Sequence, residues 1–124
     1  MVAPIEIPNL LIADDDQAFR ETVVEILEPH FPMVAVESGE RAIEVVETIQ
    51  VDVVILDMHM HVMTGLDTLR WLKERYRELP CILMSSDVSE ELETQAYDLN
   101  AFRVLRKPPR RQHLIDIIHR AVKL

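Results

Sequence analysis

Short apolar runs alternate along this chain with segments whose apolar residues recur at helical spacing. Each run is followed by a segment in which hydrophobic side chains repeat every three or four positions. Such alternation is typical of repeated strand–helix units, and it predicts a mostly parallel sheet covered by helices. The expected strands occupy residues 10–13, 33–36, 53–56, 81–84 and 102–105.

The composition of the runs indicates where each strand lies in the sheet. The first, third and fourth runs are continuously apolar, as strands buried on both faces should be, whereas the fifth carries Arg103 and is expected at an edge. Five such units within 124 residues favour an open sheet, because a closed eightfold barrel needs about twice that length. We therefore expect an α/β fold, a doubly wound (βα)5 parallel sheet.

Local signals mark several helix ends. Asp16 is expected to cap the first helix, and Thr64 with Asp67 has the spacing of a capping box for the third. Pro108–Pro109 precedes the last apolar stripe, where a fixed φ suits a helix entrance. The stripe of the second helix extends to Ile49. No linker interrupts the pattern, so we expect one domain over 1–124 with its core at about 9–122.

Charge and composition exclude several classes of function. The formal net charge of −9 argues against direct binding of nucleic acid or of an anionic membrane surface. The two glycines, Gly39 and Gly65, are too few and too far apart for a glycine-rich phosphate cradle. One cysteine, Cys81, cannot form an internal disulfide, and no apolar run is long enough to span a bilayer. We expect a cytoplasmic protein with no membrane insertion.

Polar residues follow four of the expected strands. Asp14 and Asp15 follow the first, Asp57 the third, Ser85 the fourth and Lys107 the fifth. Because the carboxyl ends of parallel strands meet at one edge of a sheet, we expect these side chains to converge. Clustered carboxylates repel one another, so the arrangement calls for a hard cation bound through oxygen, for which Mg²⁺ is the natural candidate. The lysine and the serine hydroxyl would then hold a phosphoryl group.

The ordered set of motifs resembles the receiver domain of two-component response regulators over about residues 9–122. An acidic pair follows the first strand, and the aspartate after the third strand is followed eight residues later by Gly65. Ser85 follows the fourth strand, and Lys107–Pro108 follows the fifth. For this family we expect the flavodoxin-like strand order 2-1-3-4-5.

The resemblance assigns a role to each site residue. It implies that Asp57 accepts a phosphoryl group from a histidine kinase or a phosphotransfer protein, with Ser85 and Lys107 contacting that group. The implied Mg²⁺ ligands are Asp14, Asp15, Asp57 and the backbone carbonyl of His59. The chemistry would be self-directed phosphotransfer and hydrolysis, so we do not expect an enzyme. A downstream protein would bind the face formed by the fourth helix, the fifth strand and the fifth helix.

Three positions depart from the pattern of the family. The switch position, usually aromatic and three residues before the lysine, is Val104, which leaves the coupling to output open. The position four residues after Asp57, usually proline, is His61, and a position usually occupied by glycine is Asn100. Asparagine also tolerates left-handed backbone.

Three alternative functions remain open at this point. Val104 leaves room for a receiver-like scaffold that binds partners without phosphorylation. Asp57, His59 and His61 alternate with a period of two, which in a continuing strand would suit a zinc hydrolase. Asp14 and Asp16 have the spacing of a haloacid dehalogenase-type phosphatase, although Ala18 stands where that family has threonine.

Overall fold

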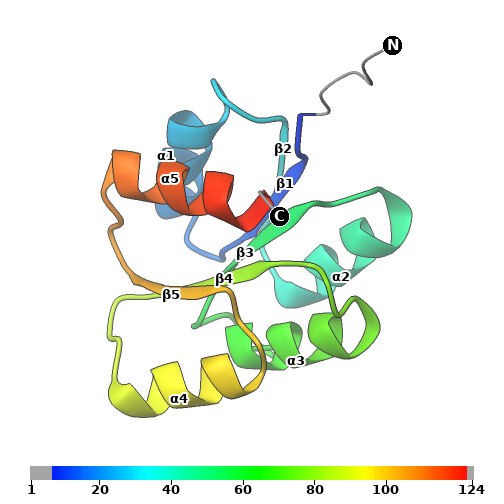
Figure 1. Ribbon diagram of the computed structural model, residues 1–124, viewed down its shortest axis with the longest axis vertical. Coiled ribbons are helices and arrows are strands. Elements are labelled where there is room, and N and C mark those ends of the chain that lie inside the picture. The colour runs from blue at the N-terminus through cyan, green and yellow to red at the C-terminus, as the bar shows by residue number, and fades with distance from the viewer. Residues whose placement is uncertain (1–6, 123–124) are drawn as a thin grey trace.

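The computed structural model describes residues 7–122, in which five strands alternate with five helices (Figure 1). The strands and helices follow one another in strict alternation, as the sequence pattern predicts. In chain order they are β1 (Leu10–Ala13), α1 (Gln17–Leu27), β2 (Met33–Val36), α2 (Gly39–Thr48), β3 (Val53–Asp57), α3 (Gly65–Arg75), β4 (Cys81–Ser85), α4 (Glu90–Asp98), β5 (Arg103–Arg106) and α5 (Arg111–Val122).

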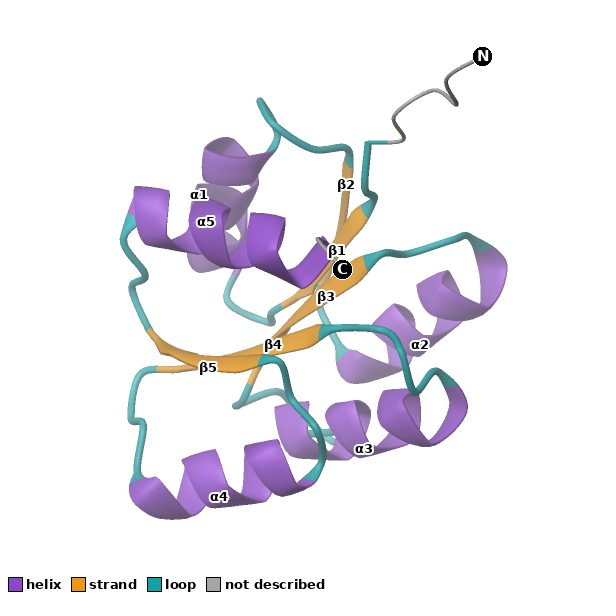
Figure 2. Ribbon diagram, in the orientation of Figure 1, coloured by secondary structure: helices purple, strands orange, loops and turns teal. Residues whose placement is uncertain are grey.

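The strands form one parallel sheet in the order β2-β1-β3-β4-β5, which confirms the expected topology. Helices α1 and α5 cover one face, and α2, α3 and α4 cover the other (Figure 2). Strand β5, which carries Arg103, lies at an edge as predicted. The result is a three-layer doubly wound fold.

Alternation along the buried strands separates the core into two halves. In β1, Leu10 and Ile12 pack with α1 and α5, whereas Leu11 and Ala13 pack on the opposite face. Successive side chains of a strand point to opposite faces, so a strand between two helical layers must be apolar throughout. Every residue of β1, β3 and β4 is buried, including the terminal Asp57 and Ser85.

Two of the expected helix caps are confirmed. The Asp16 carboxylate accepts a hydrogen bond from the Phe19 amide at 3.2 Å and so caps α1. Thr64 and Asp67 form the reciprocal capping box of α3, with both hydrogen bonds at 3.1 Å. These caps satisfy amides that have no partner inside the helix and fix where each helix begins.

Two local expectations were wrong. Helix α5 begins at Arg111, because its first backbone hydrogen bond joins the Leu114 amide to the Arg110 carbonyl. Pro108–Pro109 therefore lies in the preceding loop, where the Lys107–Pro108 bond is cis. Ile49 does not join the apolar stripe of α2: the helix ends at Thr48, and the extended backbone of Ile49 leaves its side chain 44% exposed.

Within residues 7–122, no helix is both long enough and apolar enough to cross a membrane.

Candidate functional site

The sheet brings the ends of four strands together at one edge. Leu56 pairs with Ala13, so that Asp14 and Asp57 follow directly after neighbouring positions of β1 and β3. On the other side, Asp57 pairs with Met84, and the Lys107 amide donates to the Ser85 carbonyl at 2.9 Å. The five polar residues expected to converge therefore lie at the same end of the sheet.

Three carboxylates gather at this edge. Oxygens of Asp14, Asp15 and Asp57 lie within 4.8 Å of one another. Asp14 and Asp57 are buried, whereas Asp15 is exposed to solvent. Buried carboxylates are costly unless they are paired, so the cluster requires positive charge nearby.

Lys107 supplies one such charge. Its Nζ atom lies 2.8 Å from Oδ2 of Asp14 and 2.9 Å from Oδ1 of Asp57. Its side chain is only 12% exposed, so water screens these ion pairs weakly. Three carboxylates face one ammonium, which leaves an excess of negative charge if all are ionised. A hard cation bound through oxygen fits this set of donors.

Burial and charge act in opposite directions on this cluster. Burial raises the pKa of Asp14, with a smaller contribution from the Asp57 charge, and the hydrogen bonds from Lys107 and from the Asp16 amide offset this only in part. For Lys107, burial alone would lower the pKa, but the hydrogen bonds and charges of Asp14 and Asp57 outweigh it and raise the pKa. The lysine is therefore held in its charged form.

The start of α1 completes the surroundings of Asp14. Asp14 Oδ1 accepts a hydrogen bond from the Asp16 amide at 2.9 Å, and its carbonyl accepts one from Arg20 Nη1 at 2.6 Å. The Phe19 ring lies against Lys107, with 4.2 Å between Nζ and the ring centroid. Phe19 and Arg20 were not predicted as site residues, because helical spacing places Phe19 only on the apolar face of α1.

Ser85 is fully buried at the end of β4, beside the strand that ends at Asp57. Its hydroxyl accepts a hydrogen bond from the Asp87 amide and donates one to the Asp87 carbonyl, both at 3.2 Å. The hydroxyl thus binds the following turn in this structure. It lies at the sheet edge where the sequence places it.

The loop after β3 is held by its backbone and leaves its histidines in solvent. The Gly65 amide donates to the Met58 carbonyl at 2.9 Å, and a Cβ on Gly65 would lie 2.4 Å from the Asp57 carbonyl oxygen. That close approach explains a glycine eight residues after Asp57. His59 and His61 are both exposed, and His61 Nε2 lies 3.8 Å from Asp15 Oδ2.

The histidine alternative required β3 to continue past Asp57, but the strand ends there. Asp57, His59 and His61 therefore do not share one strand face. In the described part of the chain, the only group of three or more potential ligands within metal-binding reach consists of carboxylates. Oxygen ligands of this kind suit Mg²⁺ rather than zinc.

Tyr97 contacts β5 at the position that departs from the family pattern. Its hydroxyl accepts a hydrogen bond from the Val104 amide at 3.1 Å, and its side chain is 41% exposed. Asn100, in the loop before β5, has φ 66°, which is the left-handed conformation that asparagine tolerates. The sequence did not predict the contact of Tyr97, which joins α4 to the edge strand.

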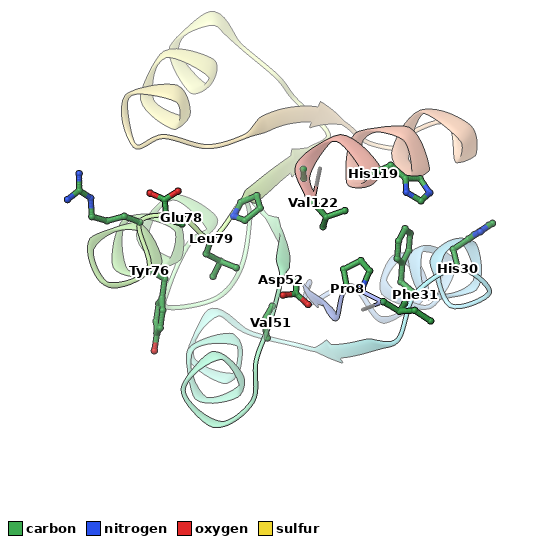
Figure 3. Close-up of a pocket in the computed structure, with 14 residues that line it drawn as sticks. Pro8, His30, Phe31, Val51, Asp52, Tyr76, Glu78, Leu79, His119 and Val122 are labelled. Carbon is green, nitrogen blue, oxygen red and sulfur yellow. The ribbon is translucent and has the colours of Figure 1, made fainter. Parts of the chain in front are cut away.

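A cleft of about 890 Å³ lies at the opposite end of the sheet (Figure 3). Its lining includes Pro8, Phe31, Asp52 and Leu79, which precede β1, β2, β3 and β4 respectively, and Val122 at the end of α5. Ligands of open α/β sheets bind outside the carboxyl ends of the strands, and this cleft lies at the amino ends. It is therefore separate from the carboxylate cluster.

Comparison with known proteins identifies the family. Residues 10–119 match the response regulator receiver domain, and the chain belongs to that family. The match and the Asp16 cap together decide against the haloacid dehalogenase alternative. Receiver domains interact with histidine kinases or phosphotransfer proteins.

Similar proteins include transcriptional and other regulators. The chain is 35% identical to the transcriptional regulatory protein DegU of Brevibacillus brevis, over 89% of this chain and 48% of the relative. It is 33% identical to the heme response regulator HssR of Staphylococcus saprophyticus, over 79% of this chain and 44% of the relative. The chain thus spans less than half the length of these two relatives.

Solved structures share the fold at lower identity. The signal receiver domain of an HD domain-containing protein from Pseudomonas fluorescens Pf-5 superposes with a TM-score of 0.90 at 22% identity, covering 95% of this chain and 96% of that one. The chemotaxis response regulator CheY4 of Vibrio cholerae superposes with a TM-score of 0.86 at 23% identity, covering 94% and 99%.

Proposed function

We propose that Asp57 accepts a phosphoryl group from a histidine kinase or a phosphotransfer protein in a Mg²⁺-dependent reaction. One observation carries the assignment: Asp57 is a buried carboxylate within a cluster of three, and its Oδ1 atom lies 2.9 Å from the Lys107 ammonium. Two buried carboxylates that share one lysine are costly to bury, and such groups are concentrated at functional sites. The cluster is suited to an anion that arrives with a cation.

In the proposed reaction, a carboxylate oxygen of Asp57 attacks the phosphorus atom of a phosphohistidine. An oxygen–phosphorus bond forms and the nitrogen–phosphorus bond breaks, with the electron pair returning to the imidazole of the donor. Lys107 balances charge on Asp57 before transfer and on the phosphoryl oxygens afterwards. The protein contributes position and electrostatics, and only its own aspartate is modified, so we do not class it as an enzyme.

The carboxylates Asp14, Asp15 and Asp57 would hold the Mg²⁺ ion, together with the backbone carbonyl of His59. In the described loop after β3, the carbonyls of Met58 and His61 accept backbone hydrogen bonds, whereas those of His59 and Met60 accept none, so the His59 carbonyl is available to a ligand. When bound, the ion would neutralise charge that develops on the transferred group. The excess of carboxylates over ammonium groups at the site supports this assignment.

Ser85 would contact the phosphoryl oxygens. Its hydroxyl donates to the Asp87 carbonyl at 3.2 Å, a long hydrogen bond that it would exchange for a bond to a phosphoryl oxygen. The exchange would release the turn after β4 and so affect the start of α4. We propose the face formed by α4, β5 and α5 as the surface that meets a downstream protein.

Residues 1–124 would act as one receiver domain in this scheme, within a protein that we place in the reducing cytoplasm on the basis of the buried free thiol of Cys81.

Val104 supports a second candidate function, a receiver that binds its partner without phosphorylation, because a valine cannot act as a rotating aromatic switch.

Mapping the modified residue tests the proposal. The protein would be incubated with acetyl phosphate and Mg²⁺, reduced with borohydride, and digested for peptide mass analysis. Borohydride reduces an aspartyl phosphate to homoserine, so we expect homoserine at position 57. Homoserine at another aspartate would contradict the assignment, and an unmodified protein would favour the phosphorylation-independent scaffold.

A further inference from the structure

The aromatic ring of Phe19 forms the third contact of the Lys107 ammonium. The ring centroid lies 4.2 Å from Nζ, well within the range of a cation–π interaction. The other two contacts are the ion pairs to Asp14 and Asp57. Lys107 is therefore held by two anions and by one neutral group.

The position of Phe19 follows from the start of α1. Asp16 caps this helix through the Phe19 amide itself, at 3.2 Å. The side chain is half-buried and packs against the core between α1, α5 and the sheet. The helix cap and the core contacts together hold the Phe19 ring beside Lys107. This lysine follows β5 and lies 88 positions further along the chain.

The three contacts of Lys107 respond differently to phosphotransfer. Asp57 changes both charge and shape when it becomes an acyl phosphate, so its bond to the ammonium must be exchanged for one to a phosphoryl oxygen. Asp14 and Phe19 remain chemically unchanged. A lysine side chain has a long flexible stem, and only fixed neighbours keep its ammonium in place during such an exchange.

We propose that Phe19 is a positioning residue for phosphotransfer, whose ring keeps the Lys107 ammonium beside residue 57 while the ammonium changes partner. This inference rests on the proposed function of Asp57. An aliphatic side chain at position 19 would fill the same apolar space but would lack the electron-rich face that attracts the cation. The effect of such a change is therefore on the lysine rather than on the fold.

Two variants of Phe19 distinguish the effect of the aromatic face from the effect of side-chain volume. Phe19→Leu removes the aromatic face, and Phe19→Tyr keeps it. Phe102→Leu is the matched control, because the Phe102 ring packs against the same core half but contacts Arg103 instead of Lys107. Any general loss of packing should appear in both leucine variants.

The first measurement is the proton chemical shift of the Lys107 ε-methylene in the unphosphorylated protein. The face of an aromatic ring shifts nearby protons upfield, so we expect an upfield resonance in the wild type, in Phe19→Tyr and in Phe102→Leu. Phe19→Leu should return it to the ordinary lysine position. An unchanged shift in Phe19→Leu would overturn the inference, and this result needs no phosphorylation.

The second measurement is the rate of phosphorylation by acetyl phosphate with saturating Mg²⁺. We expect Phe19→Leu to lower the maximal rate by roughly three- to tenfold, the range of one partly desolvated cation–π contact. The acetyl phosphate concentration that gives half the maximal rate should change little, and Phe19→Tyr should restore the rate. An equal loss in Phe102→Leu, or no loss in Phe19→Leu, would overturn the positioning role. A wild type that is never phosphorylated would instead remove the proposed function on which it rests.

Discussion

Lys107 Nζ lies 2.9 Å from Oδ1 of Asp57, and the same ammonium lies 2.8 Å from Asp14. The proposed acceptor is therefore a carboxylate whose charge is already partly balanced by the protein. Two buried carboxylates with no cation beside them would repel each other, and the Lys107 ammonium between Asp14 and Asp57 offsets that repulsion.

Removal of this lysine should have opposite effects on two properties: Mg²⁺ should bind more tightly, and phosphorylation should become slower. Lys107→Met deletes a positive charge next to the carboxylates, so we expect Mg²⁺ to bind about fivefold more tightly or better. Phosphorylation by acetyl phosphate should nevertheless slow at least about tenfold, because the ammonium no longer balances the phosphoryl group. Calorimetric titration and phosphorylation kinetics measure the two effects.

Lys73→Met provides the control for that variant, because the Lys73 ammonium binds the carbonyls of Arg77 and Leu79 away from the carboxylates. Its affinity for Mg²⁺ should match that of the wild type. Unchanged Mg²⁺ affinity in Lys107→Met would show that the lysine and the cation do not share this site.

The three aspartates after β1 should differ in role: Asp14 and Asp15 bind Mg²⁺, whereas Asp16 caps α1. Asp15→Asn removes a charged ligand, and we expect the affinity for Mg²⁺ to fall severalfold or more. Asp16→Asn should leave it unchanged, because asparagine caps a helix about as well as aspartate and Asp16 lies outside the cluster. The two variants differ by one position, and equal losses of affinity would contradict the assignment.

Asp14 should make the folded state less stable as the pH rises in the absence of a divalent cation. Burial raises its folded pKa above the ordinary 3.8, so the folded state retains a proton that the unfolded state has released. Stability is therefore lost as the pH rises from near 3.8 through the folded pKa. Asp14→Asn cannot ionise, so it should be more stable than the wild type at pH 7 in EDTA.

Urea denaturation at several pH values measures this difference, which should disappear toward pH 3. A variant that is equally stabilised at every pH would show that ionisation of Asp14 is not the cause. Addition of Mg²⁺ to the wild type should reduce the difference at pH 7, because the ion binds the ionised carboxylate only in the folded state.

The sequence predicted the framework of the site because strand ends are readable from pattern alone. Three apolar runs that stop at Asp14, Asp57 and Ser85 place polar groups at one edge once the sheet is parallel. The cap at Asp16 was equally predictable, since a carboxylate three positions before a free amide is a local signal. Each of these inferences depends on neighbouring positions in the chain.

Contacts between distant elements could not be predicted in this way. The approach of Lys107 to Phe19 depends on how α1 sits on the sheet, and the bond from Val104 to the Tyr97 hydroxyl depends on the path of α4. The start of α5 was misplaced for a related reason. A Pro–Pro pair is compatible both with the start of a helix and with a loop. The hydrogen bond that the Arg110 carbonyl accepts from the Leu114 amide shows that α5 begins after the pair.

Neighbouring backbone atoms leave no room for a side chain at Gly65. A methyl group there would lie 2.4 Å from the Asp57 carbonyl oxygen and 2.8 Å from Met58 Cα, both backbone atoms that cannot rotate away. We expect Gly65→Ala to lower the free energy of unfolding by roughly 1–3 kcal/mol, the usual range for overpacking. If this variant had the same urea midpoint as the wild type, the loop after β3 would accommodate the methyl group without loss of stability.

The central claim is that Asp57 is the phosphoacceptor of a Mg²⁺-dependent receiver domain, and intact-protein mass tests it most directly. Wild type and Asp57→Asn would be incubated with acetyl phosphate, each with and without Mg²⁺. We predict a gain of one phosphoryl group in the wild type with Mg²⁺ and in no other sample. An equal gain in Asp57→Asn, or no gain in the wild type under either condition, would contradict the account.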